Sequence, residues 1–289
     1  MRVDKSFYEK FEIDLSSLCN LECPLCVRNY THAQHLMKPG RPLKEITNQL
    51  DTFPNLKYSN IAGMLSEPSM YKDFIPFIEY LNKRNIQKEI HVNGDLHNDS
   101  YWENFVNILQ PEDIVYLTVC GSTQEIHEKY RVNSSLKRVI EVAEILKEKV
   151  IIQIIIFEYN KDDISNIEEM FQDYNTMIIV SESFKLFDVE YIDNPQDDIS
   201  VPHNIRSAVE SLYRMKYNKK GTISCSYMNN KMITISSDGT EWACHIQAEN
   251  NIPFDYDYSD ILEYSHLSCV GCEKQVFTIL DKLKIDKVT

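Results

Sequence analysis

Six short β-rich runs alternate with amphipathic segments over the first 180 residues, and this alternation constrains the fold of the 289-residue chain more than any other feature. The predicted strands, rich in β-branched and aromatic side chains, span 11–15, 57–63, 89–93, 113–119, 150–156 and 176–180. The predicted helices, with apolar side chains at helical spacing, span 73–83, 101–109, 136–147 and 164–171. Such alternation predicts a mostly parallel α/β sheet, and six units indicate a partial (β/α)6 barrel rather than a closed eight-stranded one.

The alternation ends near residue 190. Residues 190–203 are acidic and contain two prolines, which is typical of a linker. No strong strand–helix repeat continues beyond them. We therefore predict an α/β domain over 8–190, an acidic linker over 191–205 and a small C-terminal domain over 206–289.

Charge and hydropathy exclude several classes of partner. The chain has 30 basic and 44 acidic residues, a formal net charge of −14, and a field of that sign repels the phosphate backbone of nucleic acid. The longest strongly apolar stretch, 150–157, contains Gln153 and is too short to span a bilayer. The first residues are too charged for a signal peptide. We expect a cytoplasmic protein without a membrane partner, whose 8 cysteines indicate metal binding or catalysis rather than disulfides.

Three of these cysteines, Cys19, Cys23 and Cys26, follow the first predicted strand directly. They therefore occupy a loop at the carboxyl end of a strand, where α/β folds place their chemistry. Three thiolates can hold three irons of a cubane cluster and leave the fourth iron open for another ligand. The alternative is a structural zinc site that lacks its fourth ligand.

This C-x₃-C-x₂-C motif after the first strand resembles that of the radical S-adenosylmethionine (radical SAM) superfamily. The resemblance implies a [4Fe-4S] cluster whose open iron chelates the amino and carboxylate groups of S-adenosylmethionine (SAM). It also implies reductive cleavage of SAM to a 5′-deoxyadenosyl radical, which abstracts a hydrogen atom from the substrate. Residues 8–190 would then form the catalytic domain.

The second predicted strand leads into a segment, 63–68, that resembles the Gly-Gly-Glu-Pro segment of the family. In the family, the polar groups of this segment bind the ammonium group of SAM. The resemblance therefore implies the same role for Ser66 and Glu67. Ser66 replaces the second glycine, so the match is partial. A carboxylate is a natural counterion for an ammonium group; the alternative for Glu67 is an ordinary loop acid.

Two further strand ends carry partial matches. Asn93 and the glycine after it resemble a Thr-Asn-Gly segment of the family, and Thr118 begins a segment that resembles Ser-x-Asp-Gly with a downstream arginine, here Arg131. The resemblance implies that Asn93 and Thr118 contact the cofactor and that Arg131 pairs with a carboxylate, which a guanidinium fits bidentately. A packing or surface role is the alternative for each.

Four more cysteines lie in the C-terminal part of the chain: Cys225, Cys244, Cys269 and Cys272. With Gly239 five residues before Cys244, they resemble the Twitch auxiliary domain, a shortened relative of SPASM domains. The resemblance implies a second [4Fe-4S] cluster with four thiolate ligands and a role in electron transfer. A structural Cys₄ zinc site is the alternative.

Cys120 is the one cysteine outside these two sets, and it replaces the aspartate of the family pattern. A thiol can donate a hydrogen atom to a carbon radical; the alternative is a small buried apolar residue. We interpret His32, His35 and His245 as ordinary surface or packing residues. The basic residues Arg28, Lys38 and Arg41 could dock an acidic flavodoxin or ferredoxin electron donor, or belong to a solvated loop.

The cysteine pattern resembles that of antibiotic-pathway dehydrogenases of the family. We therefore expect a radical SAM oxidoreductase that dehydrogenates a small polar metabolite, such as an aminocyclitol or a sugar. The second hypothesis is a peptide maturase that epimerises or cross-links its substrate, with Cys120 as hydrogen-atom donor. About 11 residues precede the first strand, which leaves no room for a leader-binding domain and counts against this hypothesis. The third is a non-catalytic iron–sulfur or zinc protein.

Overall fold

The computed structural model describes residues 4–24, 26–29, 31–63, 65–180, 230–242, 244 and 248. Cys225, Cys269, Cys272 and His245 lie outside the described residues, as does the predicted linker 191–205. The domain boundaries, the linker and the second ligand set therefore stay predictions.

One sheet of eight strands organises the described residues, with the strand order β6-β5-β4-β3-β2-β1-β7-β8. The strands are β1 (Lys10–Ile13), β2 (Tyr58–Ile61), β3 (Gln87–Val92), β4 (Ile114–Val119), β5 (Val150–Ile156), β6 (Asn175–Val180), β7 (Met232–Ile235) and β8 (Glu241–Trp242). Strands β1 to β6 pair in parallel with their neighbours in sequence order. All six predicted strands are confirmed, with bounds shifted by a few residues at their ends.

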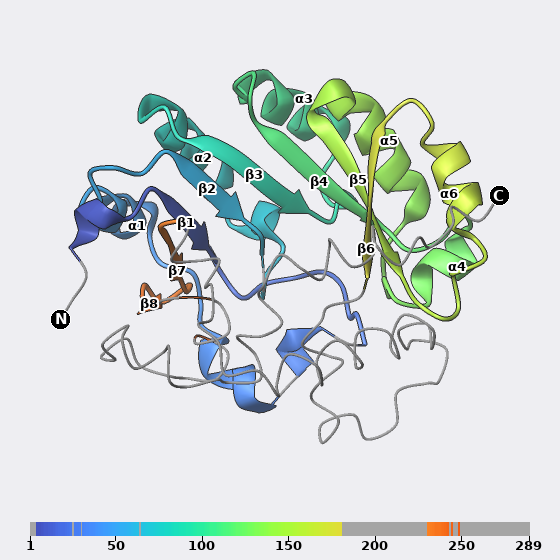
Figure 1. The fold of residues 1–289 in the computed structure, drawn as a ribbon, viewed down its shortest axis with the longest axis horizontal. Helices are drawn as coiled ribbons and strands as arrows, with labels where there is room; N and C mark the ends of the chain where they lie inside the picture. Colours follow the sequence, from blue (N-terminus) through green and yellow to red (C-terminus); the bar gives the residue numbers. More distant parts are fainter. Residues whose placement is uncertain are drawn as a thin grey trace, which may run out of the picture.

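Helices connect the parallel strands and cover one face of the sheet, where α2, α3 and α5 lie side by side (Figure 1). The α-helices are α1 (Leu43–Leu50), α2 (Phe74–Lys83), α3 (Asp99–Ile108), α4 (Gln124–Glu128), α5 (Leu136–Leu146) and α6 (Ile164–Met170). Short 3₁₀ helices are η1 (Lys5–Phe7), η2 (Val27–Asn29), η3 (Thr31–Leu36), η4 (Pro68–Met70) and η5 (Lys147–Lys149). This arrangement confirms the predicted partial (β/α)6 barrel. No helix in the described ranges is long and apolar enough to cross a membrane.

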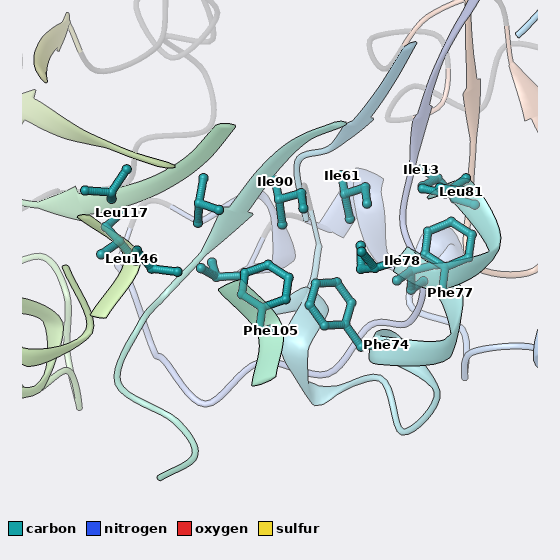
Figure 2. Packing of buried hydrophobic residues seen from close by; sticks show 14 of the residues in the cluster. Ile13, Ile61, Phe74, Phe77, Ile78, Leu81, Ile90, Phe105, Leu117 and Leu146 are labelled. Atoms are coloured by element: carbon teal, nitrogen blue, oxygen red, sulfur yellow. The ribbon is translucent and has the colours of Figure 1, made fainter. Parts of the chain in front are cut away.

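The core lies between the sheet and its covering helices. Alternate side chains of the first four strands point toward the helices and are buried: Ile13, Ile61, Ile90 and Leu117. Helix α2 meets them with an apolar stripe at helical spacing, Phe74, Phe77, Ile78 and Leu81, and α3 adds Phe105 (Figure 2). Burying each such side chain stabilises the fold by roughly 1.5–3 kcal/mol, so this layer fixes the strand ends on which the site is built.

The opposite face of the sheet is polar over β1, β2 and β3. Glu12 pairs in register with Asn60, and Asn60 with Glu89, so these three residues share one row across β1, β2 and β3. Further along, the ring of His91 stacks on that of Tyr116, with 4.5 Å between centroids and 13° between planes. Because successive side chains of a strand alternate between faces and Ile90 and Leu117 are buried against the helices, His91 and Tyr116 lie on the face opposite the helices.

Strands β7 and β8 were not predicted from the sequence. Strand β7 pairs in parallel with β1, Lys10 opposite Met232 and Ile13 opposite Ile235, and a tight turn leads into antiparallel β8. Gly239 in this turn has φ +89°, and a Cβ there would lie 2.4 Å from a guanidinium nitrogen of Arg41. Arg41 Nε in turn donates to the carbonyl of Ser237, so this predicted docking residue is engaged within the chain.

Candidate functional site

The loop after β1 carries the three cysteines of the predicted cluster. Cys23 is buried, and Cys19 and Cys26 are half-buried. The backbone N–H of Cys26 donates to the carbonyl of Cys23 at 3.1 Å, and that carbonyl also accepts from Nδ2 of Asn29 at 3.0 Å. These bonds hold the second and third cysteines on one tight turn. Asn29 supports this turn because its side-chain amide donates to backbone carbonyl groups that have no partner in a helix or strand.

Two backbone hydrogen bonds fasten this loop to other strand ends. The N–H of Glu67, in the loop after β2, donates to the carbonyl of Leu18 at 2.7 Å. The N–H of Glu22, between the first two cysteines, donates to the carbonyl of Val132 at 3.2 Å. The cysteine loop is thereby joined to the segment that follows β2 and to the segment that follows α4, and both segments contain predicted cofactor residues.

A cubane takes each thiolate to a separate iron, so Cys19, Cys23 and Cys26 would supply one ligand to each of three irons. The sulfur of Cys19 accepts two N–H groups at 3.5 Å, from the backbone of Leu21 and from Nδ2 of Asn93. Such donors stabilise the charge of a metal-bound thiolate. The three cysteines and their surroundings therefore fit a [4Fe-4S] cluster.

Glu67 lies at the centre of the predicted cofactor residues and is 1 % exposed. Its Oε1 accepts from the N–H and the hydroxyl of Ser69, and its Oε2 accepts from the N–H of Asn93 at 2.6 Å. Burial raises the pKa of this carboxyl group to about 7, although the hydrogen bonds oppose the shift. A carboxylate accepts about four hydrogen bonds, so roughly one position remains for a ligand.

Arg131 and Asn93 are brought together. Nη2 of Arg131 donates to Oδ1 of Asn93 at 2.8 Å, and the guanidinium is buried, with 8 % of the residue exposed. Its Nε has no hydrogen-bond partner in the described part of the structure. Burial alone lowers the pKa of a guanidinium, but the neighbouring Cys23 and Cys120 sulfurs raise that of Arg131. A cation is therefore held beside the cysteine loop.

The other two predicted cofactor residues have partners at neighbouring strand ends. Ser66 is buried, and its hydroxyl lies 3.5 Å from Oδ1 of Asp14. The hydroxyl of Thr118 donates to Oε1 of Gln153 at 3.3 Å. Thr118 follows Leu117 on β4 and points to the polar face, away from the core. Both residues thus lie at the carboxyl edge of the sheet.

Cys120 is fully buried at the end of β4, in an apolar cluster with Cys23 and Phe157. Burial raises the pKa of its thiol to about 12, so the sulfur keeps its proton at neutral pH. Its backbone N–H donates to Nδ1 of His127 at 3.3 Å. A protonated thiol beside the cysteine loop is compatible with hydrogen-atom donation and with simple packing.

Cys244 lies close in sequence to Trp242 and Ala248, which both pack against the segment after the cysteine loop in a cluster that includes Leu36. His35 Nε2 lies 2.7 Å from the carbonyl oxygen of Ala248. His35 also meets Trp242 edge to face, so it acts as a packing residue. This part of the C-terminal region is therefore held next to η2 and η3.

Sequence reasoning missed three polar residues of this edge. Oδ1 of Asp14 accepts from the N–H of Leu65 at 3.2 Å, which shapes the loop after β2. Nδ2 of Asn20 donates to Oδ1 of Asp95 at 2.8 Å. The alternation of β1 places Asp14 on the polar face and could have indicated it. Asn20 and Asp95 carry no local signal, because their pairing joins residues far apart in the chain.

Comparison with known proteins fixes the class of the protein. Residues 13–173, more than half of the chain, match the family model of the radical SAM superfamily. The chain therefore belongs to the radical SAM superfamily. Membership implies a [4Fe-4S] cluster and SAM as cofactors. A search of curated proteins finds no match.

Solved structures of SuiB share the fold at low sequence identity. Streptococcus suis SuiB bound to the precursor peptide SuiA is 15% identical, with a TM-score of 0.61 and a match that covers 91% of this chain and 66% of that one. SuiB bound to S-adenosylmethionine is 14% identical, with a TM-score of 0.57 and coverage of 95% and 68%. BtrN in complex with AdoMet and 2-DOIA is 14% identical, with a TM-score of 0.47 and coverage of 96% and 87%. The chain spans about two thirds of the length of SuiB.

Proposed function

We propose that Cys19, Cys23 and Cys26 hold a [4Fe-4S] cluster with one open iron, and that the enzyme cleaves SAM there to modify a substrate by redox chemistry. A cluster held by these cysteines would supply the reducing electron for cleavage of SAM to a radical that abstracts a substrate hydrogen. The observation that carries the proposal is the placement of the three cysteines on one loop at the carboxyl end of β1, beside the buried Arg131.

The residues around the loop suit the two charged groups of the SAM methionine. Arg131 offers an unpartnered Nε in a buried position, which suits a carboxylate because the guanidinium has several donors in one plane. Glu67 and Ser66 lie in the loop after β2, which is hydrogen-bonded to the carbonyl of Leu18. Their side-chain oxygens can accept hydrogen bonds from the ammonium group. Thr118 lies at the end of β4 on the polar face, where it would contact the same cofactor.

The polar face of the sheet supports a small polar substrate. Burial lowers the pKa of His91 to about 4, so that its imidazole is neutral, and Gln153 forms a hydrogen bond with it. Neutral imidazole, amide and phenol groups can exchange hydrogen bonds with hydroxyl and amino groups. We therefore favour dehydrogenation of a metabolite such as an aminocyclitol or a sugar.

Such an oxidation leaves one electron to remove from the substrate radical. We propose that Cys225, Cys244, Cys269 and Cys272 bind a second [4Fe-4S] cluster that accepts it. Packing of Trp242 and Ala248 against the segment after the cysteine loop supports a position near the first site. We propose a flavodoxin or ferredoxin as the electron donor. Arg41 donates a hydrogen bond to the carbonyl of Ser237, so Arg28 and Lys38 remain as the basic residues that would dock this donor.

A second candidate function is peptide epimerisation with Cys120 as hydrogen-atom donor. The raised pKa of its thiol and its packing against Cys23 favour this reaction, because only the protonated thiol can donate a hydrogen atom. Cys120→Ala separates the candidates once a substrate is found. Epimerisation requires loss of product while SAM cleavage continues, and unchanged product formation excludes it.

Anaerobic reconstitution tests the main proposal. We expect about eight irons per chain from two cubanes, and 5′-deoxyadenosine when SAM and dithionite are added. A variant with Cys19, Cys23 and Cys26 all changed to alanine should keep about four irons and cleave no SAM. Any SAM cleavage left in that variant contradicts the proposed role of the loop. Zinc without iron in the wild-type protein would identify a non-catalytic scaffold.

A further inference from the structure

We propose that Asn93 is a positioning residue that raises the reduction potential of the first cluster through a hydrogen bond to the sulfur of Cys19, while it orients Arg131. The inference rests on the proposed cluster at Cys19, Cys23 and Cys26. The sequence motif predicts that Asn93 contacts the cofactor. The role proposed here is different, because the polar side-chain atoms of Asn93 already form hydrogen bonds with other residues of the protein.

Four segments of the chain meet at Asn93. Its backbone N–H donates to Oε2 of Glu67 at 2.6 Å. Its side-chain Nδ2 donates to Oδ1 of Asn20 at 2.7 Å and to the sulfur of Cys19 at 3.5 Å. Its Oδ1 accepts from Nη2 of Arg131 at 2.8 Å. Asn93 is 9 % exposed, so these bonds form with little competition from water.

The identity of the partners fixes the orientation of the amide. Arg131 can only donate hydrogen bonds, so the atom of Asn93 that faces it must be the oxygen. The nitrogen must then face Cys19 and Asn20. An alternative in which the two atoms are exchanged would place two donors against each other at the Arg131 contact. The orientation in which Nδ2 faces the sulfur of Cys19 is therefore fixed by the arginine.

A hydrogen bond to a cluster sulfur favours the reduced state. Reduction adds negative charge to the cluster, and donors at its sulfurs stabilise that charge, so they raise the potential. Removing the Asn93 donor should make the cluster harder to reduce. Removing the Asn93 acceptor should leave Arg131 without its anchor, which should weaken SAM binding without any direct contact between Asn93 and SAM.

Two variants separate these effects from loss of structure. Asn93→Ala removes donor and acceptor without adding charge, and Asn93→Asp is isosteric, removes the donor and keeps the acceptor. Asn29→Ala is the matched control: its amide also holds the cysteine loop, but through the carbonyls of Cys23 and Pro24 rather than a sulfur. Each reconstituted protein is titrated with dithionite, and the potential is read from the EPR signal that changes when SAM is added.

We expect the potential to become more negative in Asn93→Ala and further so in Asn93→Asp, and to shift less in Asn29→Ala, which loosens the loop but removes no donor to a cluster sulfur. The KM for SAM should rise in Asn93→Ala. In D₂O exchange, the reduced cluster of both Asn93 variants should lose one exchangeable proton coupling that wild type and Asn29→Ala retain. Wild-type potentials and couplings in both Asn93 variants overturn the inference, whereas a wild-type protein without 5′-deoxyadenosine formation refutes the proposed function instead.

Discussion

The backbone N–H of Asn93 donates a 2.6 Å hydrogen bond to Oε2 of Glu67 and thereby joins the end of β3 to the loop after β2. The other carboxylate oxygen is held by Ser69, at the start of η4. This buried carboxyl group fixes the position of the end of β3 relative to the loop after β2. Its protonation state should control the stability of the protein and the charge at this position.

Glu67→Gln should remove a pH dependence from the stability of the protein. The pKa of Glu67 lies at about 7 in the folded state because of burial, against 4.5 for an unperturbed group. A carboxyl with a raised pKa stabilises the fold fully below pH 4.5, and this stabilisation is lost as the pH rises through 7.

The wild-type free energy of unfolding should therefore fall, relative to that of Glu67→Gln, by about 1.4 kcal/mol per pH unit in this window. The difference should level off above about pH 8. Urea unfolding of both proteins between about pH 5.5 and 9 measures it. A difference that does not change with pH would show that Glu67 is ionised throughout.

Arg131→Ala should weaken SAM binding by roughly 10- to 150-fold, since a hydrogen bond to a charged group contributes about 1.5–3 kcal/mol. Arg131→Lys should lie between wild type and Arg131→Ala, because it keeps the charge and loses the planar donor group. SAM titration of the reconstituted proteins gives the affinities.

Arg138→Ala is the matched control for Arg131→Ala. Arg138 lies on α5 and forms ion pairs with Asp99 and Glu141, both partly exposed, so its loss should cost less than about 1 kcal/mol of stability. It should leave SAM affinity unchanged. Equal effects of the two arginine substitutions would remove the case for a carboxylate at Arg131.

Lys88→Met should destabilise the protein by about 3–5 kcal/mol, because it leaves a buried charge without its partner. Nζ of Lys88 lies 2.9 Å from Oδ2 of Asp113, and both side chains are 0% exposed. Thermal or urea unfolding measures the loss. The control is Lys137→Met, which removes an exposed pair with Glu141 at 3.7 Å and should change stability by no more than about 0.5 kcal/mol.

Gly94→Ala should cost about 1–3 kcal/mol of stability, the range expected for a residue forced into a rare backbone conformation. Gly94 has φ +82°, and an added Cβ would lie 2.8 Å from Cδ2 of Leu117. Because Gly94 follows Asn93, the substitution should also weaken SAM binding. A variant with wild-type urea midpoint and SAM affinity would contradict both expectations.

The periodicity of the sequence was sufficient to predict the parallel sheet. The run 150–156 coincides with β5, because it is too short for a typical helix and is rich in β-branched side chains, which favour a strand. Strand β7 has four residues and pairs with β1 from the far end of the chain. A local pattern cannot identify such a partner, so β7 and β8 were missed.

Motif comparison selected residues that the fold brings together, but it did not reveal how they are connected. Cys19, Asn93 and Arg131 are linked by hydrogen bonds between residues 38 and 74 positions apart. Asn20 accepts a further hydrogen bond from Asn93, and Asp14 accepts one from Leu65 in the loop after β2; no motif specifies either residue. Their roles depend on which strand ends are adjacent, and that information enters only with the sheet order.

The pairing of β7 with β1 has a consequence for biosynthesis. During translation the chain emerges from its N-terminus, and N-terminal structure forms first. One edge of β1, the strand that leads into the cysteine loop, must stay without its parallel neighbour until residues 232–235 have been made. An open strand edge is a template for pairing with other chains. Nascent or truncated forms that stop before residue 232 should therefore aggregate, and delivery of iron to the loop should succeed best after release from the ribosome.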